Sequence, residues 1–107
     1  MDGFAMFGKV TAKPGQRDAL VEHLLEAARL LAPLPGCEFY IINTVTSEPD
    51  VVAVFELWHT QADHDASLTL DSIKALITRA QPLIAGFEGT RLVPVGGKGL
   101  KPSTGPP

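Results

Sequence analysis

The chain has 107 residues, of which 45% are hydrophobic and 20% are charged, as expected for one globular domain. Its net charge of -3, with no basic stripe, gives no electrostatic reason to expect nucleic acid or an anionic membrane as a partner. Its one cysteine, Cys37, excludes an internal disulfide, and no Cys/His cluster has zinc spacing. No apolar run approaches transmembrane length, and no signal peptide is apparent. We expect a cytoplasmic protein without a metal.

The first half of the chain predicts a strand, a helix and a second strand. Residues 4–12 are rich in aromatic and β-branched side chains, and the Lys-Pro-Gly segment 13–15 ends this strand. Over residues 17–31, leucine and alanine recur at three- and four-residue spacing, which is the pattern of an amphipathic helix. The Pro- and Gly-containing segment 33–36 ends the helix, and residues 37–45 follow as a strand.

The second half predicts two more strands and two helices. Residues 47–50 predict a tight reversal into a strand over residues 51–59. A short helix over 61–67 and a longer one over 71–84 come next, before a last strand over 88–95. The order β-α-β-β-α-β, with an antiparallel sheet, is that of ferredoxin-like α+β domains.

The apolar pattern of the predicted strands indicates a dimer. Two helices can cover only one face of a four-stranded sheet, yet in strands 37–45 and 51–59 both alternating sets of residues are apolar. An antiparallel sheet with one wet face would alternate instead. The uncovered face therefore needs a partner, for which a second copy of the sheet is the simplest choice. We expect the domain to span residues 1–96, followed by a mobile or loosely docked Gly/Pro-rich tail over 97–107.

The most specialised stretch is the end of the third predicted strand. Glu56 and the only tryptophan, Trp58, lie two residues apart, and alternate residues of a strand point to the same face. We therefore expect the carboxylate and the indole together at the rim of the closed interior. A buried carboxylate needs a partner, which Arg79 or Arg91 could provide.

Three segments resemble the antibiotic biosynthesis monooxygenase family, dimeric α+β-barrel proteins that include small cofactor-free monooxygenases and quinol oxidases. The segments are residues 7–15 before the first helix, Phe55-Glu56-Leu57-Trp58 with the helix after it, and the closing Leu92-Val93-Pro94-Val95. The resemblance covers about residues 4–96. It implies a homodimeric barrel that binds a small aromatic and needs no cofactor. It is less specific for the reaction, because the family includes unrelated chemistries.

The chain departs from the family pattern on the helix after the third strand. Where many quinol-type members carry two histidines, this chain has Ser67 and Ser72. The first strand lacks the asparagine of haem-degrading relatives, so haem cleavage is not expected. In the polyketide-oxidising type, an Asn, a Trp, a Tyr and an Arg line the pocket. Trp58 here matches the Trp, His64 falls near the Tyr, and Arg79 falls near the Arg.

The catalytic candidates are therefore Trp58, His64 and Arg79. A cofactor-free oxygenase must deprotonate an electron-rich phenol or quinol and stabilise the anion in a dry pocket. Trp58 would supply a stacking wall and an N–H donor, or else pack in the core. His64 would be the base, because histidine titrates near neutrality, or else a solvated side chain between two aspartates. His23, on the polar face of the first helix, is expected to be solvated.

The substrate-binding candidates are Asn43, Glu56 and Phe39. Asn43 shares the face of Glu56 if Thr46 pairs with Val51 across the turn. A slip of one residue in register would reverse that placement. Alternatively, Asn43 satisfies local backbone groups, and Glu56 forms a structural ion pair.

Two main functions remain open from the sequence. One is a small monooxygenase that oxidises a phenolic or quinol-like aromatic with dioxygen. The other is a non-catalytic dimer that binds a small ligand on the same fold, which the absence of both helix histidines favours. An isomerase or decarboxylase is a third alternative.

Overall fold

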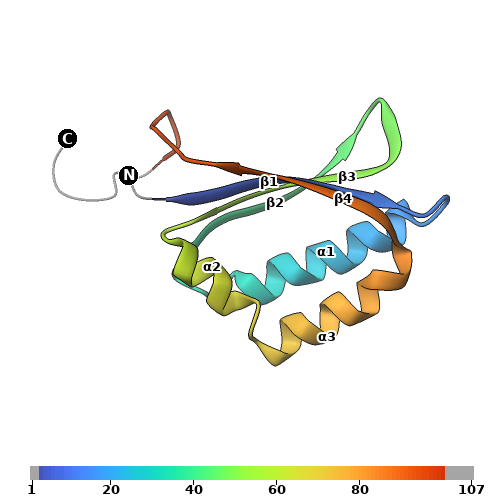
Figure 1. Cartoon of the computed structure of the whole chain (residues 1–107), viewed down its shortest axis with the longest axis horizontal. Helices are drawn as coiled ribbons and strands as arrows, with labels where there is room; N and C mark the ends of the chain where they lie inside the picture. Colours follow the sequence, from blue (N-terminus) through green and yellow to red (C-terminus); the bar gives the residue numbers. More distant parts are fainter. Residues whose placement is uncertain (1–2, 101–107) are drawn as a thin grey trace, which may run out of the picture.

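A computed structural model describes residues 3–100 of the chain. It contains an antiparallel four-stranded sheet in the order β2-β3-β1-β4, with the helices on one side (Figure 1). This is the predicted ferredoxin-like α+β fold. None of the helices within residues 3–100 is long and apolar enough to cross a membrane. Most of the predicted tail, residues 101–107, lies outside the described residues. The elements are β1 (Phe4–Ala12), α1 (Arg17–Leu31), β2 (Cys37–Val45), β3 (Glu48–Trp58), α2 (Gln61–Ser67), α3 (Asp71–Ala80), the 3₁₀ helix η1 (Gln81–Leu83) and β4 (Ile84–Leu92).

The bounds of β1, α1, β2 and α2 are those predicted, whereas those of β3, the last helix and the last strand differ. β3 begins at Glu48, so most of the reversal predicted at 47–50 belongs to the strand. The helix predicted to reach Ile84 ends at Ala80, because Pro82 lacks an N–H and its ring clashes with the preceding helical turn. Ile84 instead pairs with Ala12 and begins β4, four residues earlier than predicted. The same strand ends at Leu92, before Pro94, which cannot donate to a strand ladder.

The helix-covered face of the sheet carries the core in two adjoining clusters. One contains Val10, Ala12, Leu20, Val52, Val54 and Ala80. The other, at the α2 end of the sheet, contains Phe4, Leu31, Trp58 and Ile73. Leu20 and Val52 have no exposed surface, and full burial of such a side chain stabilises the fold by roughly 1.5–3 kcal/mol.

The opposite face of the sheet, which we call the open face, is also apolar. Phe7, Ile41 and Leu92 lie on it and are each more than a third exposed. At one end, the segment 93–100 faces the sheet across a hollow of about 500 Å³ that Phe39 and Leu57 help to line. The apolar character expected of both faces is therefore present.

Candidate active site

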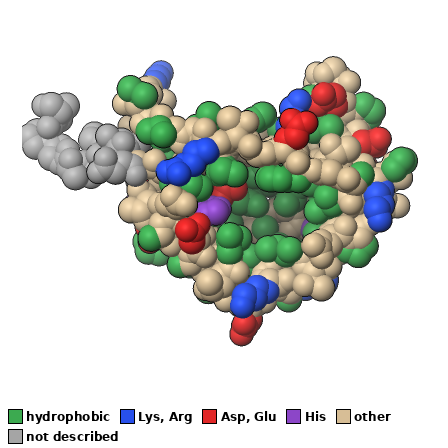
Figure 2. All heavy atoms as spheres, viewed as in Figure 1, with side chains coloured by type: hydrophobic (Ala, Val, Ile, Leu, Met, Phe, Trp, Pro, Cys, Tyr) green, Lys and Arg blue, Asp and Glu red, His purple; other side chains and the backbone are tan. Residues whose placement is uncertain are grey.

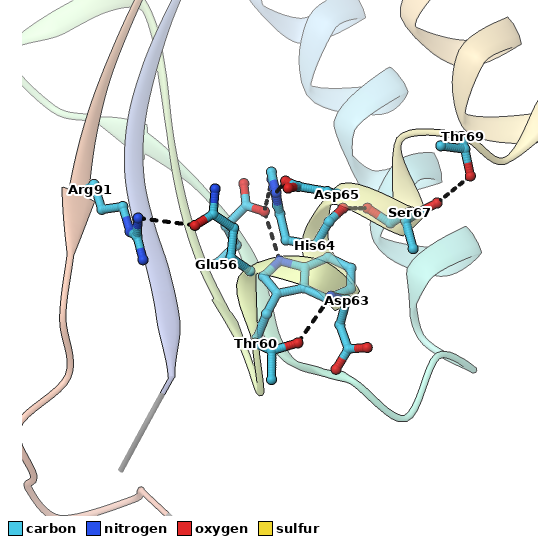
Figure 3. A network of polar contacts seen from close by, with 11 residues as sticks. Glu56, Thr60, Asp63, His64, Asp65, Ser67, Thr69 and Arg91 are labelled. Carbon is cyan, nitrogen blue, oxygen red and sulfur yellow. Dashed lines mark hydrogen bonds and ion pairs between the residues drawn. The ribbon is translucent and has the colours of Figure 1, made fainter.

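The site begins where β3 runs into α2. Thr60 caps α2 by accepting a hydrogen bond from the Asp63 N–H at 3.1 Å (Figure 3), as expected of an N-cap threonine. Gly36, in the turn before β2, allows α2 to approach closely, since a Cβ there would lie 2.6 Å from Asp63 Oδ2. α2 therefore lies against this end of the sheet, beside Glu56 and Trp58 of β3.

Glu56 is the centre of a small polar network (Figure 3). The Trp58 indole N–H donates to Glu56 Oε1 at 2.8 Å, and His64 Nε2 lies 3.6 Å from the same oxygen. The Glu56 and His64 side chains are each only 17% exposed. The partners of the carboxylate are thus an indole and an imidazole, whereas the two candidate partners, Arg79 and Arg91, bind Glu26 and Gln61 instead.

His64 is held in place by aromatic rings and by a second carboxylate. Its ring lies 4.6 Å from the Phe4 ring and meets the Trp58 ring edge-on at 5.7 Å between centroids. Its Nδ1 is 2.9 Å from Asp65 Oδ1. Because an ionised carboxylate can only accept a hydrogen bond, Nδ1 is the nitrogen that carries the hydrogen. In the neutral ring, Nε2 therefore keeps its lone pair on the side of Glu56, and these two groups can hold one proton between them.

Arg91 of β4 packs against the outer side of the network. Its guanidinium lies 4.6 Å from the centroid of the Phe4 ring and donates to Gln61 Oε1 at 3.2 Å. A cation over an aromatic face is favourable by about 0.5–1 kcal/mol at exposed sites. Arg91 thus links β4 to α2 through Gln61 and lies against the ring that contacts His64.

A cavity of about 160 Å³ lies beside this network, between the sheet and the helices. Figure 2 shows a hollow on this side of the molecule, with mostly hydrophobic side chains around it. Apolar cavities of roughly this volume accommodate one benzene ring. Its apolar walls come mainly from α1 and α3, and its polar lining consists of His23, Tyr40, Glu56, Trp58, His64 and Ser67.

The other predicted site residues lie elsewhere. Arg79, at the end of α3, is exposed and donates to Glu26 Oε2 at 2.7 Å, and it does not line the cavity. Asn43 pairs with Ala53, not with Val54, and Phe39 pairs with Leu57, so both point to the open face. The expected register was wrong by one residue, because irregularities at both ends of the β2–β3 pairing shift it. Asn43 Nδ2 donates to Ala53 O at 3.0 Å and to Ile41 O at 3.3 Å, which is the local backbone role considered as its alternative.

Two cavity residues were missed by the sequence analysis. His23 was expected to be solvated, yet it is partly buried and lines the cavity, with Nδ1 donating to Ala19 O at 2.9 Å. Tyr40 lies directly across from Glu56 on the helix-covered face. Burial first, then the charges of Glu56 and Cys37, raise the pKa of Tyr40 well above its usual value. The sequence pattern that could have found Tyr40 is strand alternation, which places it on the face opposite to that of Phe39 and Ile41. This pattern assigns Tyr40 to the cavity only when the β2–β3 register is known.

Cys37 is partly buried, and burial together with Glu56 and Glu38 raises the pKa of its thiol to about 11, so at neutral pH it is a thiol and a poor nucleophile. Within residues 3–100, no three His, Cys, Asp or Glu side chains are grouped so that they could hold a metal ion.

Comparison with known proteins identifies relatives. The model of the antibiotic biosynthesis monooxygenase family matches residues 3–79. The chain is 39% identical to a candidate antibiotic biosynthesis monooxygenase from Chloroflexus aurantiacus, over 94% of this chain and 100% of that one, with a TM-score of 0.84. Similar folds with lower identity include candidate members from Caulobacter crescentus (23% identity, 89% and 92% covered, TM-score 0.81) and Nitrosomonas europaea (14%, 87% and 90%, 0.82). No curated protein sequence matches the chain.

Proposed function

Since the chain belongs to the antibiotic biosynthesis monooxygenase family, we propose that it is a cofactor-free monooxygenase that oxidises a small phenolic or quinol-like aromatic with dioxygen. The proposal rests on one observation, the pairing of Glu56 and His64 beside an otherwise apolar cavity. A carboxylate and an imidazole that face each other can accept a substrate proton together. The apolar walls exclude water from the anion that remains.

The reaction needs a base, a dry pocket and a group that stabilises the phenolate. The phenolic O–H proton passes to the Glu56–His64 pair, and the phenolate gives one electron to dioxygen. The resulting radical pair combines at a ring carbon, the peroxide anion takes the proton back from the Glu56–His64 pair, and the hydroperoxide then loses water to give the quinone. One phenol and one dioxygen thus yield one quinone and one water. In this scheme Trp58 is a ring wall and orients Glu56, because its N–H is already donated to that carboxylate.

We propose that the working form is a homodimer joined through the open face. Phe7, Ile41 and Leu92 leave apolar surface there that a second sheet would bury. A stable interface of this kind buries about 1,200 Å² or more in total. Light scattering at micromolar concentration measures the mass in solution. A mass of 11.4 kDa, that of one chain, would contradict the proposed dimer.

The alternative function is a binding protein without turnover, favoured by Ser67. This residue stands where many family members carry a histidine, and its hydroxyl donates to His64 O at 2.6 Å. It therefore offers no base to a ligand. In the binding protein, the cavity would take an aromatic ligand and leave it unchanged.

An oxygen electrode separates the two functions. With a panel of hydroquinones and dihydroxynaphthalenes, we expect oxygen uptake by the metal-free protein, together with quenching of the Trp58 fluorescence. His64→Ala should lower turnover by about 10²–10⁴-fold, the usual contribution of a general base, with little change in binding. The matched control is His59→Ala, since His59 is exposed and pairs with Glu38. Quenching of the Trp58 fluorescence without oxygen uptake across the panel would support the binding protein. The absence of both quenching and oxygen uptake would argue against the cavity as the binding site.

A further inference from the structure

An anion formed in the cavity needs a hydrogen-bond donor, and most donors on the cavity wall are already engaged. The Trp58 N–H donates to Glu56, and the Ser67 hydroxyl donates to His64 O. The Nδ1 hydrogens of His23 and His64 are directed at Ala19 O and at Asp65. With these hydrogens engaged, each neutral imidazole offers only an acceptor, Nε2, to the cavity.

Tyr40 is the remaining polar group on the cavity wall. Within residues 3–100, the side-chain hydrogen bonds of β2 belong to Cys37, Glu38 and Asn43, and none involves the Tyr40 hydroxyl. The same residues contain no fully buried polar side-chain atom without a partner. The hydroxyl oxygen of this partly buried side chain therefore has open space beside it, and Tyr40 is one of the residues that line the cavity.

We propose that the Tyr40 hydroxyl is a catalytic residue that donates a hydrogen bond to the phenolate oxygen of the substrate, on the side of the cavity where Glu56 and His64 accept its proton. The assignment rests on the proposed function and adds the group that selects an oxygen-bearing ring. Tyr40 and Glu56 lie directly opposite each other in the β2–β3 register. One substrate oxygen can thus be reached by the base and by the donor together.

The surroundings of Tyr40 keep its proton in place. Burial, then the nearby Glu56 and Cys37, raise its pKa, so the hydroxyl remains a neutral donor throughout the pH range in which a phenol ionises. A neutral donor suits this position, because the proton removed from the substrate stays in the Glu56–His64 pair and no second cation needs to be buried.

The test uses binding without dioxygen, so that it is independent of turnover. The probe is 4-nitrophenol near neutral pH, where both its forms are present and the phenolate is read by its yellow absorbance. The isostructural probe without a hydroxyl is nitrobenzene, measured by calorimetry. Tyr40→Phe removes only the hydroxyl, and Thr44→Val removes a hydroxyl from the same strand outside the cavity wall.

Tyr40→Phe should weaken nitrophenolate binding by about 10- to 100-fold, the effect of losing a hydrogen bond to a charged group. Nitrobenzene binding should stay within about twofold, and Thr44→Val should change neither. Unchanged nitrophenolate binding in Tyr40→Phe would overturn the assignment, as would equal weakening of both probes or no binding of nitrophenolate to the native protein. Absence of oxygen uptake in the oxygen electrode would count against the proposed oxidation only. The nitrophenol binding assay is done without dioxygen, so its result does not depend on that reaction.

Discussion

The two faces of the sheet are built from alternating residues of the same strands, and they differ in what covers them. On the helix-covered face, β3 contributes Val52, Val54, Glu56 and Trp58, and the helices of the same chain enclose a cavity around the last two. On the open face, β3 contributes Ala53, Phe55 and Leu57, and the residues around them include the exposed Phe7 and Ile41. The cavity and the Glu56–His64 pair thus lie on the face that the helices of the same chain cover. The open face carries the apolar Phe7, Ile41 and Leu92 together with the polar Lys9, Asn43 and Glu88.

The largest effect is expected from Glu56 on the helix-covered face. Glu56→Gln keeps the size of the side chain, and its amide oxygen can still accept the hydrogen bond from the Trp58 N–H. It removes the carboxylate that shares a proton with His64. We expect turnover to fall by about 10²–10⁴-fold, measured by oxygen uptake. Glu38→Gln is the control, because Glu38 pairs with exposed His59. Full activity in Glu56→Gln would contradict the proposed pair, because His64 would then act as the base without the Glu56 carboxylate.

Two isoleucines of nearly equal exposure compare the faces directly. Ile41, on the open face, is 47% exposed, and Ile77, on α3, is 45% exposed. Ile41→Asp would place an unpaired charge in the proposed interface, which costs several kcal/mol, so we expect the dimer dissociation constant to rise by at least about 100-fold. Ile77→Asp should leave assembly unchanged. Light scattering over a dilution series measures both, and equal behaviour of the two variants would argue against the open face as the interface.

The pH dependence of stability reports on the helix-covered face. Cys37 and Tyr40 both have raised pKa values, so the folded protein holds these protons more tightly than the unfolded chain does. Their contribution to stability is complete below the ordinary pKa of cysteine and is lost as the pH rises from about 9 through the folded value of about 11 for Cys37. Urea unfolding between pH 8 and pH 11 should show this decline, and Cys37→Ala should make it shallower. A steeper decline in that variant would contradict the assignment.

The smallest effect is expected from Asn43 on the open face. Asn43→Ala removes the hydrogen bonds to the Ile41 and Ala53 carbonyls, and we expect the free energy of unfolding to fall by about 1 kcal/mol. Binding of 4-nitrophenol in the cavity should not change, since Asn43 points away from it. Loss of nitrophenol binding with unchanged stability would return Asn43 to the site.

The predictions from sequence succeeded where a local pattern was sufficient. The bounds of β1, α1, β2 and α2 follow from alternation, helical spacing and the breakers between them. The shared face of Glu56 and Trp58 needed only the two-residue period of a strand. The segment 81–84 was assigned to the wrong element, because a short apolar run fits both a helix and a strand, and Pro82 decided between them.

For the site, the residues alone predicted that Glu56 and Trp58 share a face. His64 was a candidate base, but its contact with Glu56 was not predicted. The residues alone could not place Asn43, Phe39, Tyr40 or His23, since those positions depend on how β2 pairs with β3 and how α1 lies over the sheet. A shift of one residue in strand pairing reverses every side chain of the strand, and here irregularities at Cys37–Phe39 and Thr44–Val45 set that shift. The sequence therefore determines which neighbouring residues of a strand share a face. Which residues line the cavity is decided by the tertiary structure, because it depends on strand pairing and on how the helices pack over the sheet.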